Sequence, residues 1–337
     1  MKKLLLVGLV ALAIAPLAGQ VKAPYKVPRL PWGDPDLQGI WPGTDYVGTP
    51  LQRASDFGTR NQLTEEEFKA RQLAAQRQTD EDNADFSIDK VSSEQEARGT
   101  VGGPVSPPPH WLERGKPTYQ ASLIVDPPDG RMPPQTADAA ARVRALAARR
   151  AGRGPADSYE DRSLYDQCIT RGVLGSILPV IYNNGNQILQ APGLVVLRNE
   201  MIHETRFFYL DGRPHRSSKI RTYMGDSRAK WDGDTLVVET TNMFDRNGVG
   251  GNGGGQAFSD ALTITERFRR LDANTLEYTA IVDDPKTYTR PFTIQFPWRR
   301  DNSYGMFEYA CHEGNHSLFN ILSGARADDR EAASTRQ

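Results

Sequence analysis

Apolar and polar residues alternate in the second half of the chain, from about Gln187 onward. Leu262, Ile264, Glu266 and Phe268 fall on one side of the alternation, and positions 276 to 282, 292 to 298 and 236 to 244 repeat it. Strict alternation is typical of antiparallel strands with one buried face. Short strands joined by tight turns, with no helices between them, predict either an up-and-down meander closed into a barrel or a sandwich, and we favour the barrel.

The first half of the chain has a different pattern. Thr64 followed by Glu67 is a capping box that predicts a helix to about Gln78, and Ala137 to Arg150 shows helical spacing. The stretches between them are rich in proline, glycine and charge. We therefore expect a signal peptide at 1–20, a loop-rich and partly helical N-terminal extension at 21–160, an antiparallel β-barrel domain at 161–327 and a disordered tail at 328–337.

The N-terminus resembles an export signal. Lys2 and Lys3 precede an apolar run from Leu4 to Leu17, which ends in small residues. A basic start, a short apolar run and a small-residue exit are typical of a cleavable secretory signal peptide, and the run is short for a membrane span. We expect cleavage between Ala18 and Ala23, a periplasmic or secreted mature protein, and no membrane span in it.

Export changes how the two cysteines are interpreted. Cys168 and Cys311 are the only cysteines in the sequence, and an oxidising compartment favours pairing them in a disulfide. The alternative is two buried free thiols.

Lys plus Arg number 41 against 42 for Asp plus Glu, which gives a net charge of −1 and argues against nucleic acid as a partner. The sequence does not predict an oligomeric state.

Seven segments together resemble a widespread family of exported bacterial proteins of unknown function. They are PWGDPDLQGIW, IVDPPDGRMP, QCITRG, YNNGNQILQAPG, MIHETRFFYLDGRPH, GDSRAKWDGDTLVVETTNMF and FEYACHEGN, and the resemblance extends over most of the mature chain, from about residue 31 to 330. The resemblance implies an exported protein and no particular reaction. At the level of fold, the C-terminal half is similar to lipocalin-like, or calycin, barrels. Such a barrel would enclose room for one small ligand.

The HEGNH segment at 312–316 formally matches the zinc-protease motif H-E-x-x-H. That motif requires both histidines on one continuous helix. Here Phe307 to Cys311 is predicted to be a strand, and Asn315 is predicted to cap a short helix from His316 to Ser323. The two histidines would then belong to different elements, so we reject a zinc protease. His316 also stands where the resembled family usually has an aromatic residue.

Two other histidines flank a predicted turn at Asp211-Gly212. If strands on either side formed a plain hairpin, Phe208 would face His215, and His203 would lie about 16 Å away along the strand. The two imidazoles could not then share one metal, so each would need partners from Glu308, His312 or Glu313. A divalent metal is therefore one candidate cofactor, and the cofactor is otherwise unknown.

Acid–base chemistry is the less demanding alternative. Glu266 falls on an apolar strand face, where an unpaired carboxylate is costly unless Arg206 or Arg228 neutralises it. Glu308 and His312 are an even number of residues apart along the predicted strand, so their side chains would point to the same face. We take four residues as catalytic candidates: His203, Glu266, Glu308 and His312. The candidates for substrate binding are Arg206, His215, Asp226, Arg228, Trp231 and Asn242. A buried polar cluster of this kind is either a satisfied network or an active site.

Three functions remain open from the sequence. The first is an exported enzyme that binds, and acts on, a small hydrophobic or aromatic molecule inside the barrel by His/Glu/Asp acid–base or metal-assisted chemistry. The second is a non-catalytic lipocalin-like binder or carrier that uses the same interior. The third is an envelope interaction protein that uses the N-terminal extension. A filled barrel without a cavity would favour the third, and an apolar closed cavity the second.

Overall fold

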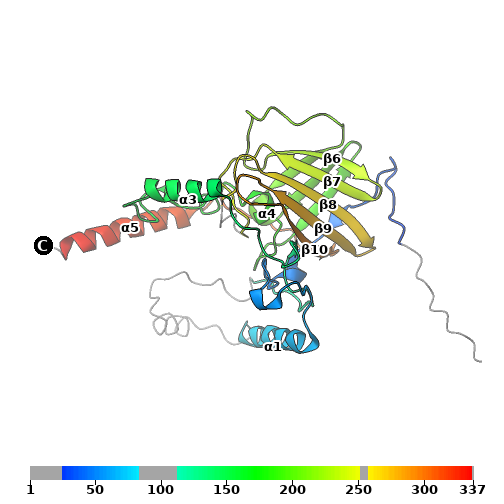
Figure 1. Cartoon of the computed structure of the whole chain (residues 1–337), viewed down its shortest axis with the longest axis horizontal. Helices are drawn as coiled ribbons and strands as arrows, with labels where there is room; N and C mark the ends of the chain where they lie inside the picture. The colour runs from blue at the N-terminus through cyan, green and yellow to red at the C-terminus, as the bar shows by residue number, and fades with distance from the viewer. Residues whose placement is uncertain (1–24, 83–111, 251–256, 336–337) are drawn as a thin grey trace, which may run out of the picture.

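Ten strands form one sheet in the computed structural model of the chain, which describes residues 25–82, 112–250 and 257–335 (Figure 1). The strands are β1 (Gly39–Ile40), β2 (Ile124–Asp126), β3 (Asn186–Ala191), β4 (Leu194–Asn199), β5 (Thr205–Tyr209), β6 (Asp226–Asp232), β7 (Thr235–Thr241), β8 (Thr263–Asp272), β9 (Thr275–Asp283) and β10 (Phe292–Arg299). The α-helices are α1 (Glu65–Asp82), α3 (Ala137–Arg149), α4 (Gly172–Gly175) and α5 (His316–Ser334).

The order of strands in the sheet is nearly the order in the sequence. Strands β3 to β10 lie side by side in sequence order, and the short strands β1 and β2 from the N-terminal half form the two ends of the sheet. The mainly β fold is confirmed. The sheet is mixed, however, and forms a half-barrel: β5 and β6 run parallel, joined by the single residue pair Tyr209 and Arg228, whereas the other neighbours are antiparallel.

The predicted alternation is confirmed in β8, β9 and β10. Phe268 pairs with Tyr278, and Tyr278 pairs with Phe296, so the three aromatic side chains share one face. Trp298 stacks on the Tyr278 ring with centroids 5.1 Å apart. All four side chains are at most 1% exposed, which makes this inner face of the sheet the centre of the hydrophobic core.

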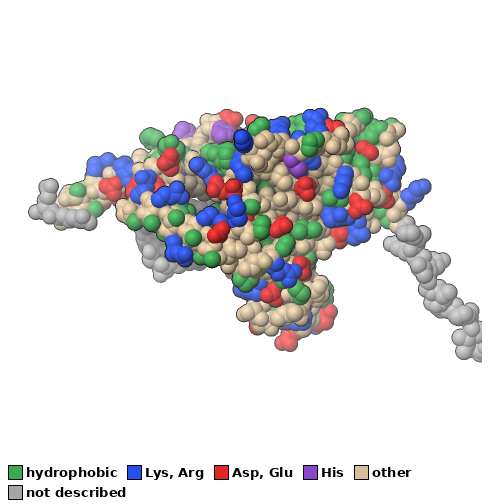
Figure 2. Space-filling model, turned by 45° about the horizontal axis from the view of Figure 1, so that its top comes forward, with side chains coloured by type: hydrophobic (Ala, Val, Ile, Leu, Met, Phe, Trp, Pro, Cys, Tyr) green, Lys and Arg blue, Asp and Glu red, His purple; other side chains and the backbone are tan. Residues whose placement is uncertain are grey.

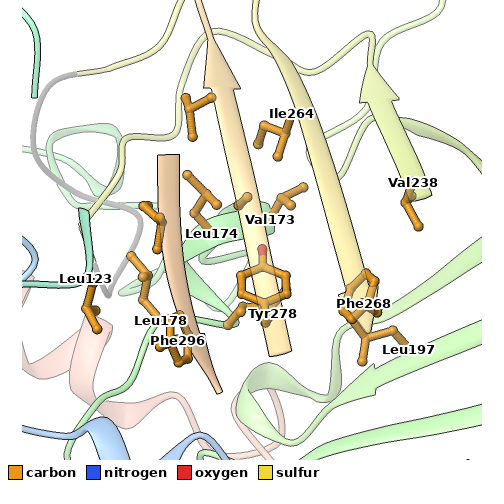
Figure 3. Packing of buried hydrophobic residues seen from close by; sticks show 14 of the residues in the cluster. Leu123, Val173, Leu174, Leu178, Leu197, Val238, Ile264, Phe268, Tyr278 and Phe296 are labelled. Carbon is orange, nitrogen blue, oxygen red and sulfur yellow. The ribbon is translucent and has the colours of Figure 1, made fainter. Parts of the chain in front are cut away.

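The inner face is covered by the chain itself. The one-turn helix α4 places Val173 and Leu174 against it, and Leu178 follows on the same side (Figure 3). Leu123, just before β2, packs into the same cluster. The interior that the sequence predicted to hold a ligand is therefore occupied by side chains from outside the sheet.

The helices outside the sheet are more exposed. The capping box at α1 is confirmed, because the Glu67 backbone N–H donates to the Thr64 hydroxyl and the Thr64 N–H donates to the Glu67 carboxylate. Asn315 caps α5 as predicted, accepting from the Leu318 backbone. The prediction that this helix stops at Gly324 is wrong, since α5 continues to Ser334 and includes most of the tail expected to be disordered.

Two local predictions are also wrong. Residues 307–311 form no strand, so Glu308 and His312 do not share a strand face. No hairpin forms across Asp211-Gly212: β5 pairs with β4, and the chain passes through a long connection before β6. The expected signal peptide at 1–20, its cleavage site and His110 lie outside the described residues.

Charge is spread over the surface rather than concentrated. Figure 2 shows basic and acidic side chains interspersed on one face, which agrees with the net charge of −1. Among the residues that the structure describes, no helix is both long and apolar enough to span a bilayer.

Shortening a side chain that covers the inner face should destabilise the fold. Leu174 is 2% exposed, so we expect Leu174→Ala to lower the free energy of unfolding by about 2–5 kcal/mol. Leu189, 45% exposed on β3, is the matched control, and Leu189→Ala should change stability by no more than about 0.5 kcal/mol. Urea denaturation measures both, and equal losses would contradict the assignment of Leu174 to the core.

Candidate functional site

The predicted site residues lie in three separate places. Arg206 and Glu266 are inside the half-barrel. His215, Asp226, Arg228 and Asn242 lie around the start of β6, with Trp231 further along that strand. His203, Glu308 and His312 lie around the pair of cysteines, at the segments 200–204 and 307–312. The structure therefore does not assemble the predicted residues into one site.

Arg206 and Glu266 form a buried ion pair. The guanidinium of Arg206 contacts both carboxylate oxygens, with Nη1 2.9 Å from Oε1. The Tyr278 hydroxyl donates to the same carboxylate at 3.0 Å, and Nη2 of Arg206 also donates to the Thr240 hydroxyl at 2.9 Å. Burial and the Glu266 charge raise the pKa of Tyr278 well above its usual value. This geometry matches the first of the two alternatives drawn from the sequence, a satisfied polar network in which an arginine neutralises Glu266.

The polar residues at the start of β6 also bind one another. The imidazole of His215 lies 3.0 Å from an Asp226 oxygen through Nδ1 and 3.0 Å from a Glu239 oxygen through Nε2. Arg228 forms an ion pair with Asp226 at 3.1 Å, and Asn242 donates to the Arg216 carbonyl at 2.9 Å. These contacts hold the long β5–β6 connection against the sheet, and Trp231 packs partly buried against the core.

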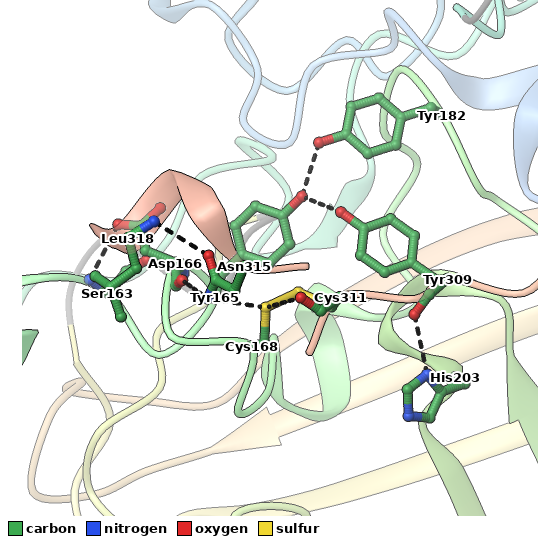
Figure 4. The surroundings of a disulfide bond; sticks show 10 residues. All are labelled: Ser163, Tyr165, Asp166, Cys168, Tyr182, His203, Tyr309, Cys311, Asn315 and Leu318. Carbon is green, nitrogen blue, oxygen red and sulfur yellow. Dashed lines mark hydrogen bonds between the residues drawn. A yellow bond between two sulfur atoms is a disulfide. The ribbon is translucent and has the colours of Figure 1, made fainter. Parts of the chain in front are cut away.

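The third place is held together by the disulfide. Cys168 and Cys311 are bonded as predicted, with Cα atoms 5.6 Å apart and a sequence separation of 143 (Figure 4). Asn315 supports the bridge, because its Nδ2 donates to the Asp166 carbonyl at 3.0 Å and lies 3.3 Å from the Cys168 sulfur. The segments 163–171 and 307–315 are thereby fixed side by side.

Three tyrosine hydroxyls meet next to this bridge. The Tyr165 hydroxyl lies 2.7 Å from that of Tyr182 and 2.8 Å from that of Tyr309 (Figure 4). Burial is the main cause that raises the pKa of Tyr165 and of Tyr182 to about 12 and also raises the pKa of Tyr309. All three hydroxyls therefore keep their protons at neutral pH and can donate hydrogen bonds. We call Tyr165, Tyr182, Tyr309 and the neighbouring Arg171 the tyrosine site.

A second hydrogen-bonded group positions Tyr309. The Tyr304 hydroxyl lies 2.8 Å from a carboxylate oxygen of Glu113 and 2.8 Å from one of Glu200. Glu200, 1% exposed, also accepts from the backbone N–H of Phe307 at 3.1 Å. A Cβ on Gly185 would lie 2.8 Å from a Glu200 oxygen, so only glycine fits there. These contacts fix the chain from 304 to 307 just before the tyrosine site.

Two predicted catalytic residues border the tyrosine site. His203 and His312 are exposed, with ring centroids 6.4 Å apart. His203 has a φ of +45° and follows Ile202 at +53°, backbone conformations that are uncommon for such residues and that turn the chain sharply after β4. The Nδ1 atom of His203 lies 3.1 Å from the Tyr309 carbonyl oxygen. Glu308 is exposed on the same segment.

The donor set around these histidines does not fit a resident metal. Structural and catalytic zinc sites take three or four protein ligands. Within residues 25–82, 112–250 and 257–335, no group of three or more His, Cys, Asp and Glu side chains could hold a metal ion. His312 precedes the cap of α5 and His316 begins the helix, so the two histidines of HEGNH lie on different elements, as the sequence predicted.

Sequence reasoning missed the tyrosine site. Tyr165 lies three residues before Cys168, and Tyr309 lies two residues before Cys311. Once the disulfide was predicted, this spacing alone would have placed the two phenols near each other. Nothing in the sequence points to Tyr182 or Arg171 as their neighbours, because those contacts come from the tertiary fold.

Comparisons with known proteins add little to this geometry. No protein-family model matches the chain, and no curated protein matches its sequence significantly. Among solved structures, the chain is similar to one titled as a secretary abundant heat soluble (SAHS) protein from Ramazzottius varieornatus. That similarity has 12% identity and a TM-score of 0.21, and it covers 35% of this chain and 70% of that one.

Removing one partner of the buried ion pair should destabilise the protein. We expect Glu266→Gln to lower the free energy of unfolding by about 3–5 kcal/mol, because Arg206 would be left as an uncompensated buried charge. A double variant, Arg206→Met with Glu266→Leu, should recover most of the loss. Chemical denaturation of the three proteins tests this. A fully stable Glu266→Gln variant would argue that Glu266 has a role other than charge neutralisation.

Removing the disulfide should both destabilise the fold and loosen the tyrosine site. For Cys168→Ser with Cys311→Ser we expect a loss of about 2–5 kcal/mol, since the bridge closes a long loop in the unfolded chain. Tyr165 and Tyr309 should then become more accessible, which spectrophotometric titration of tyrosine would show as a lower pKa for both than in the bridged protein, where burial raises the pKa of each. Unchanged tyrosine titration would contradict the positioning role of the bridge.

Proposed function

We propose that this exported protein binds a small aromatic molecule at the tyrosine site and acts on it with the aid of His203 and His312. The observation that carries the proposal is the meeting of three phenol hydroxyls, from three separate segments, beside two exposed imidazoles. Convergent polar groups among aromatic side chains are typical of small-molecule sites. The tyrosines are half-buried, so a ligand can reach them from solvent.

This proposal keeps the ligand class expected from the sequence and moves its location. Inside the half-barrel, Phe268, Tyr278 and Trp298 are packed against α4 and against one another. The polar groups there, Arg206 and Glu266, bind each other. By the criterion drawn from the sequence, this filled interior favours an envelope interaction protein over a binder that uses the barrel. At the tyrosine site, by contrast, titratable groups border solvent, which is the arrangement that favours an enzyme.

The two kinds of polar group would have different tasks. The tyrosine hydroxyls, with pKa values raised by burial, serve as hydrogen-bond donors that orient the ligand. A carbonyl oxygen can only accept, so the contact with Tyr309 assigns the proton of neutral His203 to Nδ1. Its Nε2 is then free to act as a general base, and His312 is close enough to act as the matching acid.

Export supports this assignment. The disulfide is compatible with an oxidising compartment, and the N-terminal sequence resembles a cleavable signal peptide. We place the mature protein in the periplasm or outside the cell. A hydrophobic ligand that crosses the outer boundary of a cell would meet it there.

The test is binding of a panel of simple phenols and benzoates to the mature protein, measured by calorimetry. We expect at least one compound to bind with a Kd below about 1 mM, and Tyr309→Phe to weaken it about tenfold, as the loss of one hydrogen bond near 1.4 kcal/mol would do. The control is Tyr159→Phe, because Tyr159 is 56% exposed and outside the tyrosine site. Absence of binding, or equal binding by both variants, would overturn the proposal.

The histidine variants separate an enzyme from a carrier. His203→Ala and His312→Ala remove exposed side chains and should leave the protein folded. If the bound compound is converted by the wild type and the conversion is lost in these variants, the protein is an enzyme. If the compound is bound and released unchanged by all three, the protein is a non-catalytic binder or carrier.

A further inference from the structure

Arg171 is the least expected member of the tyrosine site, because it is a cation that lies inside the protein. It is 4% exposed and immediately precedes α4, the helix that covers the inner face of the sheet. Its guanidinium carbon lies 4.9 Å from the centre of the Tyr165 ring, so the ring covers one flat side of the guanidinium. Burial lowers the pKa of Arg171, whereas the nearby tyrosines and Glu204 raise it.

The guanidinium lacks hydrogen-bond acceptors. Nε and Nη1 of Arg171 are both buried, and neither has a partner among the residues that the structure describes. A buried donor left without an acceptor is costly, and a buried charge without a counter-ion is more so. Arg206, the other buried arginine near the sheet, shows the contrast, because it forms an ion pair with Glu266.

Glu204 does not fill this role. Its carboxylate accepts hydrogen bonds from the hydroxyls of Thr170 and Ser176, and no ion pair joins it to Arg171 within the described parts of the chain. Burial also raises the pKa of Glu204, which disfavours its charged form. The backbone N–H of Arg171 is hydrogen-bonded to the Glu204 carboxyl group, but no carboxylate of the described residues is hydrogen-bonded to the Arg171 guanidinium, which faces three neutral phenols.

We infer that the ligand of the tyrosine site carries a carboxylate, and that Arg171 binds this group from inside the site. The inference rests on the proposed function and names the class of ligand: a small aromatic acid. A guanidinium presents a fork of N–H donors in its own plane, which matches the two oxygens of a carboxylate. Nε and Nη1 are the buried donors that lack an acceptor, so these are the N–H groups that we assign to the ligand.

The tyrosine hydroxyls fit the same ligand. The Tyr165 hydroxyl is hydrogen-bonded to those of Tyr182 and Tyr309, so the three phenols are held together at one place. A phenol hydroxyl that rotates away from its neighbour can donate its proton to a carboxylate oxygen instead. Arg171 and one phenol would thus give the acid a charge-assisted pair and a further hydrogen bond.

The experiment compares 4-hydroxybenzoate with its methyl ester, which lacks the negative charge and carries one additional methyl group, by calorimetry on the mature full chain. We expect the acid to bind at least tenfold more tightly than the ester. Arg171→Lys keeps a charge but loses the planar fork, and it should weaken the acid at least tenfold while changing the ester less than twofold. Arg144→Lys, an exposed arginine on α3, is the matched control and should change neither.

The outcomes separate this inference from the proposed function. If the ester binds as tightly as the acid, and Tyr309→Phe weakens both, the tyrosine site stands and the carboxylate inference is overturned. If the Arg171→Lys variant still prefers the acid to the ester as strongly as the wild type does, the carboxylate inference is also overturned. If no phenol or benzoate binds at all, the proposed function itself fails. Near-UV circular dichroism checks that the Arg171 variant is folded, and the comparison of acid with ester in the wild type needs no variant.

Discussion

The inner face of the sheet has to be covered, and much of the structure follows from this constraint. Strands β8, β9 and β10 present a continuous apolar surface, with Phe268, Tyr278 and Trp298 at its centre. The described residues form a half-barrel whose ends are β1 and β2, so the sheet does not cover this surface by closing on itself. Apolar area left in water costs about 25 cal/mol per Å². Helix α4 and the residues after it bury that area instead.

Covering the inner face also builds the tyrosine site. The chain that enters α4 carries Tyr165, Cys168 and Arg171, and the chain that leaves it carries Tyr182. The disulfide then brings in Tyr309 from the far end of the sequence. Arg171 is buried because it directly precedes a helix that must be buried. A core requirement thus places a buried cation beside the Tyr165 ring.

The sequence predicts those parts of the fold that depend on local pattern. Alternation fixes the buried faces of β8, β9 and β10, and the capping residues Thr64 and Asn315 mark the starts of two helices. Prediction from the sequence fails where the interacting residues are far apart along the chain. The segment 307–311 has the apolar alternation of a strand, but Glu200 takes the Phe307 N–H that a neighbouring strand would need. The predicted hairpin after β5 fails because the long connection brings β6 back parallel to β5, where the two strands share a single residue pair. For the same reason, nothing in the sequence predicts that Tyr182 joins Tyr165 and Tyr309, whose proximity follows from the disulfide.

Because β5 and β6 are joined in parallel by a single residue pair, the buried ion pair also helps to align the two halves of the sheet. One residue pair joins the two halves of the sheet along their backbones, so hydrogen bonding there hardly defines how β3–β5 dock against β6–β10. Arg206 of β5 reaches past Ser227 of β6 and Thr240 of β7 to Glu266 of β8. A slip by one residue would turn this guanidinium away from its carboxylate. We therefore expect the two halves to assemble in a single alignment. A misaligned arrangement would leave the buried Arg206 charge without its carboxylate partner, and this cost would disfavour it.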